Sequence, residues 1–161
     1  KFVAESDLAS RVEEPAVLWE RDGRLTKALR EGAAVYPAPD AQWIEERFWI
    51  WLHYVTGKIG RGEIFEALDF ISYLRGRVLG TLGFQAEGER PNGVRKIESL
   101  APEFARRLQQ TVATCDARDC VRALRACVEI YRSLRTPGAA ISQAAEMAAM
   151  QYLDEVERAL K

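Results

Sequence analysis

Apolar residues recur with a helical period along most of the chain beyond residue 40. The segment YPAPD (36–40) precedes this region; its two prolines interrupt helices, and Asp40 is a suitable helix N-cap. The pattern predicts a short helical turn near 94–99 and longer helices at 41–60, 63–84, 101–114, 117–135 and 140–160. Long helices of similar length joined by short turns are typical of an up-and-down bundle. We therefore predict a mainly α fold, built on a bundle of four to five helices.

The beginning of the chain follows a different pattern, in which short apolar runs alternate with short helical segments. The pattern predicts strands at 1–3 and 16–19 and short helices at 6–15 and 25–32. Strand, helix, strand and helix in succession are typical of an α/β unit. The sequence therefore predicts two parts, a small α/β remnant over residues 1–36 and a helical bundle over residues 37–161.

The composition of the 161-residue chain is that of a globular protein, with 48% apolar and 29% charged residues. The formal net charge of −1 provides no long-range attraction toward nucleic acid, which we do not expect as a partner. No apolar run approaches the roughly 20 residues that span a bilayer, and the opening residues lack the layout of a signal peptide. We therefore predict a cytoplasmic protein without a membrane partner.

Three cysteines and one histidine offer little for metal binding. Four residues lie between Cys115 and Cys120 in CDARDC, Cys127 lies further along the helix predicted at 117–135, and His53 is distant in sequence. This arrangement does not match the close ligand pairs of zinc sites. We predict no metal site in this chain, and we interpret the cysteines as reduced.

The helix predicted at 41–60 carries a polar line directly beside its apolar stripe. At 100° per residue, six apolar side chains fall within an arc of about 100° and predict the core face of this helix. They are Ile44, Phe48, Trp51, Leu52, Val55 and Ile59. Arg47, Tyr54 and Lys58, followed by Arg61 if the helix continues, lie within about 40° of a common line at the edge of that arc. These side chains either extend to solvent along the bundle surface or face a ligand.

The opposite flank of the same helix contains Gly57 and Gly60 together with Glu46, Ile50 and His53. Each glycine destabilises a helix by roughly 1 kcal/mol relative to alanine. We therefore expect another part of the protein to approach this flank closely.

The helix predicted at 63–84 has a polar stripe and an apolar face. Its polar stripe contains Glu66, Asp69, Tyr73 and Arg77, and suits either a binding face or a solvated surface. Arg75 lies in the middle of the apolar face. Because an unpaired buried charge is strongly unfavourable, we expect Arg75 to pair with a carboxylate or to reach out of the core.

Two stretches of the chain resemble the C-terminal part of bacterial nucleotidyltransferases of the antibiotic-adenylylating type. The first is KFV followed by VEEPAVLWERDGRL, which is similar to the last strands of that family's catalytic domain. The second is RFWIWLHYVTGKIGRGEIFEALDFISYLRGRVLG, which is similar to the start of its helical bundle. The resemblance covers most of the chain and is weak beyond about residue 100.

The resemblance implies transfer of a nucleoside monophosphate from an NTP to a hydroxyl of a small molecule. In that family a Gly–Ser turn and paired aspartates hold Mg²⁺, and a third carboxylate lies on a later strand. None of the first set occurs in this chain, and the third would precede Lys1. The resemblance therefore implies that Mg²⁺ and the NTP are held by an upstream catalytic domain, and that this chain alone is inactive.

The resemblance gives the bundle the role of closing the active-site cleft. It implies that Lys58 and Arg61 contact the triphosphate and that Tyr54 and His53 position the nucleotide or the acceptor, because fixed cations stabilise the charge that develops during nucleotidyl transfer. Arg47 and Asp69 complete the binding set that we predict on the same helices. Some members of that family take a general-base carboxylate from the helical part, for which Glu46, Glu63 and Glu66 are candidates that no motif separates, and we predict Glu63 and Glu66 as the catalytic residues.

A competing interpretation uses Arg47 and His53, whose spacing resembles that of HEPN-like helical ribonucleases. In such proteins an arginine binds phosphate and a histidine acts as acid or base on RNA, usually across a homodimer. Here the two residues lie about 120° apart on one helix, which disfavours a shared site within one subunit. A third interpretation is a non-catalytic bundle that mediates association.

Overall fold

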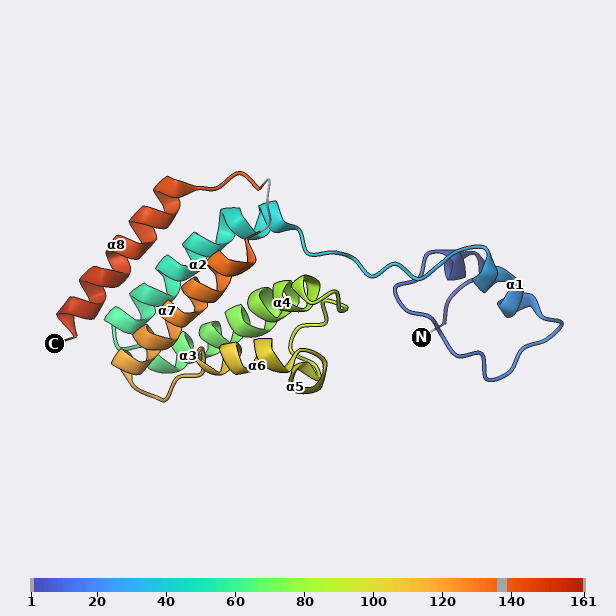
Figure 1. Ribbon diagram of the computed structural model, residues 1–161, viewed down its shortest axis with the longest axis horizontal. Coiled ribbons are helices and arrows are strands. Elements are labelled where there is room, and N and C mark those ends of the chain that lie inside the picture. The colour runs from blue at the N-terminus through green and yellow to red at the C-terminus, as the bar shows by residue number, and fades with distance from the viewer. Residues whose placement is uncertain (1, 136–138, 161) are drawn as a thin grey trace. The chain divides into compact units, whose positions relative to one another are not determined.

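The computed structural model describes residues 2–135 and 139–160 and divides the chain into two compact units. The N-terminal unit comprises Lys1–Ala38, and the bundle unit comprises Pro39–Lys161. Figure 1 shows the helices of each unit, which we describe separately. The sequence pattern predicts the boundary two residues earlier, within the same proline-containing connector.

Among its described residues, the bundle unit is helical wherever it has regular structure, which confirms the prediction of a mainly α fold. Its elements are α2 (Ala41–Gly60), α3 (Ile64–Tyr73), the π-helical segment η2 (Leu74–Leu79), α4 (Gly80–Ala86), α5 (Ile97–Leu100), α6 (Pro102–Gln109), α7 (Ala117–Leu134) and α8 (Gln143–Ala159). The segments α3, η2 and α4 follow one another without a break, as the single helix predicted at 63–84 requires. The π-helical segment within it was not predicted.

Side-chain caps and one glycine define the ends of the long helices. Asp40 accepts a hydrogen bond from the backbone N–H of Trp43 at 2.9 Å and begins α2, and Asp116 begins α7 in the same way. The turn between α2 and α3 contains Gly62, whose φ of +77° lies in the left-handed region that glycine adopts without strain. The chain therefore reverses sharply after α2, and α3 packs against it.

Helix α2 is the central element of the bundle unit, because it packs against α3, α7 and α8 (Figure 1). Phe48, Leu52 and Val55 from the predicted stripe are completely buried. Trp49 is also buried, whereas Trp51 is only partly buried, so the prediction that Trp51 belongs to the core is wrong. The buried arc is displaced toward the flank that α8 covers, and a single helix cannot reveal this displacement.

The glycine flank of α2 is the surface that α8 approaches, which confirms the predicted close approach. A Cβ atom at Gly60 would lie 3.2 Å from Cγ2 of Val156, and one at Gly57 would lie 3.5 Å from the hydroxyl of Tyr152. Both partners lie on α8. The small residues therefore let the two helix backbones come together.

The N-terminal unit contains the 3₁₀ helix η1 (Glu5–Ala9) and α1 (Arg24–Arg30), and its described residues form no β-strand. The strands predicted at residues 1–3 and 16–19 are therefore not formed in the described part of the chain. The guanidinium of Arg11 holds the unit together by donating to the carbonyls of Leu8, Leu29 and Gly32 at 2.7–3.0 Å. The described residues of this unit therefore do not show the predicted α/β remnant.

Candidate functional site

Five aromatic side chains from α2 and α3 form a continuous row on the bundle unit. The ring centroids of Trp43 and Trp51 are 5.4 Å apart, and those of Trp51 and Tyr73 are 5.7 Å apart. Phe70 follows at 5.2 Å from Tyr73, and Tyr54 at 5.0 Å from Phe70. These separations lie within the range at which aromatic rings attract one another. We call these five side chains the aromatic row.

Much of the aromatic row is open to solvent. Trp43 is 43% exposed, Tyr54 is 40% exposed and Tyr73 is 38% exposed. Contiguous exposed aromatic surface on a folded protein marks sites where a ligand or another protein binds. The row is therefore the first feature of the bundle unit that suits recognition.

A cation lies over the last ring at each end of the aromatic row. The guanidinium carbon of Arg47 is 4.4 Å from the ring centroid of Trp43, and Nζ of Lys58 is 4.9 Å from that of Tyr54. Arg47 also lies 3.5 Å from a carboxylate oxygen of Glu46. The structure thus brings the predicted residues Arg47, Tyr54 and Lys58 onto one surface, as their spacing on α2 requires.

Lys58 is held by two carboxylates from the start of α3. Its Nζ lies 2.8 Å from an oxygen of Glu63 and 2.8 Å from an oxygen of Glu66, and its side chain is only 15% exposed. The hydroxyl of Tyr54 donates to Glu66, and Nε of Arg61 lies 2.6 Å from Glu63. We call these five residues the lysine cluster. Its two positive and two negative charges balance.

The lysine cluster fixes the charge state of its carboxylates. Hydrogen bonds from Arg61 and Lys58 lower the pKa of Glu63 to about 2, and those from Lys58 and Tyr54 lower the pKa of Glu66. Hydrogen bonds to Glu63 and Glu66 raise the pKa of Lys58. A general base works best when its pKa is near the operating pH. Both glutamates are therefore weak bases here, and their geometry suits positioning of Lys58.

The remaining predicted site residues, His53 and Asp69, are exposed and lie outside the lysine cluster. The ring of His53 stacks on Tyr152 of α8, with centroids 4.5 Å apart. Arg47 instead lies over Trp43 of its own helix. The structure therefore gives Arg47 and His53 different neighbours and does not assemble them into one site within this chain.

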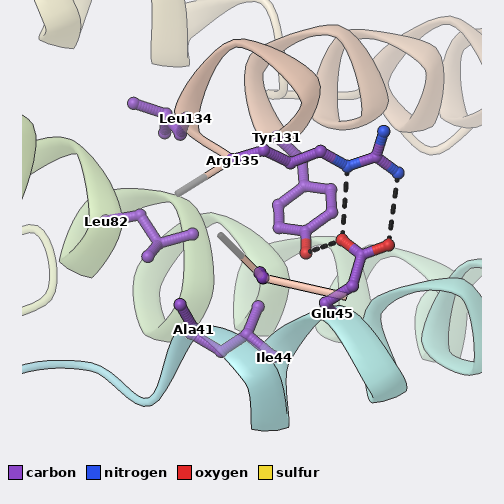
Figure 2. Close-up of a pocket in the computed structure, with 8 residues that line it drawn as sticks. Ala41, Ile44, Glu45, Leu82, Tyr131, Leu134 and Arg135 are labelled. Carbon is purple, nitrogen blue, oxygen red and sulfur yellow. Dashed lines mark hydrogen bonds and ion pairs between the residues drawn. The ribbon is translucent and has the colours of Figure 1, made fainter. Parts of the chain in front are cut away.

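A second polar cluster, which no sequence pattern indicates, lies inside the bundle around Glu45. Glu45 is 1% exposed and accepts hydrogen bonds from the hydroxyl of Tyr131 at 2.5 Å and from Nε1 of Trp49 at 3.0 Å. Arg135 donates to the same carboxylate at 3.2 and 3.3 Å (Figure 2). The hollow beside these groups has a volume of about 10 Å³, which is at the lower limit for one water molecule.

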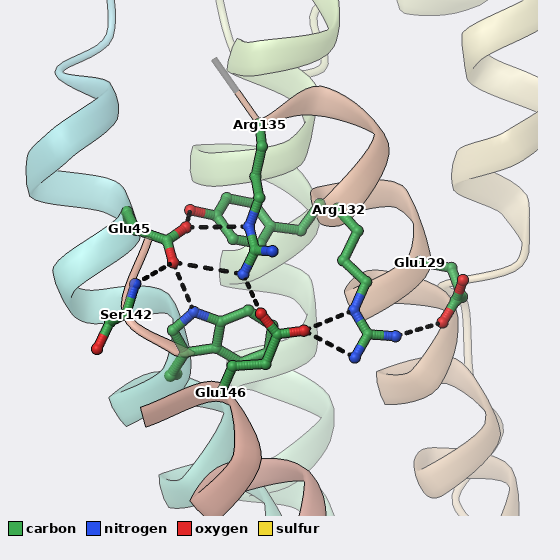
Figure 3. Close-up of polar contacts among 8 residues, drawn as sticks. Glu45, Glu129, Arg132, Arg135, Ser142 and Glu146 are labelled. Carbon is green, nitrogen blue, oxygen red and sulfur yellow. Dashed lines mark hydrogen bonds and ion pairs between the residues drawn. The ribbon is translucent and has the colours of Figure 1, made fainter. Parts of the chain in front are cut away.

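The cluster extends from Glu45 to α8 through a chain of charges. Arg135 also pairs with Glu146, and Glu146 lies 2.9 Å from Arg132 (Figure 3). The backbone N–H of Ser142 donates to Glu45 at 3.3 Å. The network therefore connects α2, the C-terminal end of α7 and the start of α8, and we interpret it as structural. We call Glu45, Trp49, Tyr131, Arg135 and Glu146 the buried network.

The buried network predicts that acid weakens the fold. Burial raises the pKa of Glu45, but hydrogen bonds from Tyr131 and Trp49 and the charge of Arg135 outweigh it, so the net pKa lies below the ordinary 4.5. A lowered pKa contributes stability that is present above pH 4.5 and is lost as the pH falls further through the folded-state value.

We expect urea unfolding at a series of pH values below 4.5 to show a steeper loss of stability for the natural protein than for Glu45→Gln, because the variant has no carboxylate to protonate at position 45. Parallel curves for the two proteins would contradict this assignment.

The described residues contain no group of three or more histidine, cysteine, aspartate or glutamate side chains placed to hold a metal ion. None of the helices among them has the length and apolar character that crossing a membrane requires.

Comparison with models of protein families, with curated proteins and with solved structures finds no match. The geometry of the aromatic row and the lysine cluster is therefore the basis for a functional assignment.

Proposed function

We propose that the bundle unit is the nucleotide- and acceptor-binding part of a nucleotidyltransferase, which transfers a nucleoside monophosphate from an NTP such as ATP to a hydroxyl of a small molecule. The observation that carries the proposal is the exposed aromatic row with a cation at each end. Aromatic side chains bind nucleobases by stacking, with about 1–3 kcal/mol for each base. Fixed cations beside them suit the phosphates of the same ligand.

Arg61 and Lys58 have different parts in this proposal. The Arg61 side chain is 57% exposed, so it is the first cation that an incoming triphosphate meets. Lys58 is less exposed and is already oriented by Glu63 and Glu66. Such preorganisation lets a cation stabilise developing charge without reorganising at the moment of reaction. Glu63 and Glu66 act as positioning residues, and the general base comes from elsewhere.

The N-terminal unit supports an upstream catalytic domain. Leu18 is 95% exposed and Trp19 is 74% exposed, and the segment 16–19 makes no backbone hydrogen bond within the described residues. An apolar extended segment of this kind becomes a strand when neighbouring strands pair with it and cover its side chains. We propose that an upstream domain supplies these strands, holds Mg²⁺ and the NTP, and works in the cytoplasm.

In the protein with its upstream domain, we expect Lys58→Ala to reduce nucleotide turnover at least tenfold, because the charge beside Tyr54 is lost while the core is unchanged. The measurement is steady-state turnover with Mg–ATP or Mg–GTP and a panel of polyol acceptors. The matched control is Arg106→Ala, which removes an exposed arginine that pairs with Glu103 on α6.

Three observations would oppose the proposal. Wild-type turnover in Lys58→Ala would leave Lys58 with a surface role only. A natural protein without an upstream Gly–Ser turn and paired aspartates would remove the catalytic domain. A change of oligomeric state on Trp51→Ala, with no nucleotide turnover in the natural protein, would assign the aromatic row to association instead.

A further inference from the structure

A hollow of about 210 Å³ lies in the bundle unit, away from the residues of the aromatic row and the lysine cluster. It is formed between η2, the segment around α5, and α6 with the turn that follows it. Its apolar lining consists of Val94, Ile97, Ala105, Leu108 and Val112. Arg75, Glu98 and Gln109 are the polar side chains at the same hollow.

Arg75 lies in this apolar lining and makes one hydrogen bond within the described part of the chain. Its side chain is partly buried, and Nη1 donates to the carbonyl of Thr111 at 3.1 Å. A guanidinium carries five N–H donors. Among the described residues no carboxylate pairs with Arg75, so of the two alternatives expected from the sequence the structure favours the second, in which the partly buried side chain reaches out of the core. An anion from outside the chain would satisfy the remaining donors.

Two backbone features border the hollow, a π-helical segment and a loop that is packed closely against it. Arg75 belongs to the π-helical segment η2, and π-helical segments occur frequently at functional sites. The loop that carries Val94 is pressed onto the end of this segment, because a Cβ atom at Gly80 would overlap the carbonyl of Gly93. The guanidinium of Arg75 donates a hydrogen bond to the carbonyl of Thr111, in the turn that follows α6.

We propose that this hollow binds a small molecule that has a single carboxylate group and an apolar body. Arg75 pairs with the carboxylate, and the five apolar side chains enclose the body. The volume is below the 300–1,000 Å³ that drug-sized ligands occupy, so the ligand is short. Glu98 is exposed at the same hollow, and its negative charge disfavours a dianion such as a phosphate monoester.

The test is a titration of the ¹⁵N-labelled chain with hexanoate, followed by the backbone amide signals of Val94, Ile97 and Leu108. We expect hexanoate to bind at least tenfold more tightly than 1-hexanol, which has no negative charge. We expect the same difference from hexyl phosphate, which has a larger negative charge than hexanoate. Equal affinity for hexanoate and 1-hexanol would overturn the proposal without any variant.

Variants test the role of Arg75 itself. Arg75→Gln should weaken hexanoate binding at least tenfold, whereas Arg77→Gln, which changes an exposed arginine of the same π-helical segment, should leave it unchanged. Val112→Trp, at the rim of the hollow, should block hexanoate by filling the space, and it provides a second route if Arg75→Gln does not fold. Natural affinity in Arg75→Gln or in Val112→Trp would contradict the site.

Discussion

Glu45→Ala is expected to lower the free energy of unfolding by about 3–5 kcal/mol, because it removes one partner from a buried charged pair. The substitution would leave the hydroxyl of Tyr131 and the indole N–H of Trp49 without their acceptor inside the bundle. It would also leave Arg135 with Glu146 alone. A buried polar group without a partner retains its full desolvation penalty, so these losses add to the missing ion pair.

The matched control for this prediction is Glu46→Ala, on the neighbouring position of α2. The Glu46 side chain is 58% exposed, so we expect its replacement to change stability by about 0.5 kcal/mol or less. Urea unfolding of both variants, followed by circular dichroism, measures the difference. Similar midpoints for the two variants would show that the buried network does not stabilise the bundle.

Gly83→Ala is expected to lower the free energy of unfolding by about 1–3 kcal/mol, the usual range for overpacking a core. This direction is opposite to the helix propensities, which favour alanine over glycine by about 1 kcal/mol. The reason is that a Cβ atom at Gly83 would overlap the ring of Phe104, which is 3% exposed and lies on α6. Because Phe104 is buried among other core side chains, an added methyl group at Gly83 forces the ring or its neighbours to shift.

Gly76→Ala provides the matched comparison in the same continuous helical stretch. A Cβ atom at Gly76 would have no atom within 4 Å, so the intrinsic preference for alanine should act alone. We expect this variant to be more stable than the natural protein by about 0.5–1 kcal/mol. Thermal unfolding of both variants tests the pair, and stabilisation by Gly83→Ala would contradict the packing described for Phe104.

The helices of the bundle unit could be predicted because their signals are local. Asp40 and Asp116 cap the helices that follow them, and Gly62 ends α2. The choice between Trp49 and Trp51 as the core residue could not be predicted in the same way. It depends on which flank of α2 is covered by α8, a helix that lies far along the chain.

The candidate site likewise has features that local sequence predicts and features that depend on contacts between helices. The position of Arg47, Tyr54 and Lys58 on one side of α2 follows from helix geometry alone. The pairing of Lys58 with Glu63 and Glu66 requires the sharp turn that brings α3 back onto α2. The buried network requires contacts across more than 80 residues, as between Glu45 and Tyr131, and no spacing along one helix indicates them.

The N-terminal unit shows the limit of strand prediction from short apolar runs. The run at 16–19 has the composition of a buried strand, but a strand forms only when another strand supplies its hydrogen-bonding partners. Within the described residues no such partner is present. The segment therefore remains extended and exposed.

The most direct test of the aromatic row as a nucleotide-binding surface is an ATP titration of the ¹⁵N-labelled protein with its upstream domain, followed by its indole N–H signals. Single Trp→Phe variants assign the signals of Trp43, Trp49 and Trp51. We predict that ATP shifts the signals of Trp43 and Trp51, while that of Trp49, whose N–H is donated to Glu45 inside the bundle, stays in place. Unchanged signals for Trp43 and Trp51 at millimolar ATP would contradict a nucleotide site on this face.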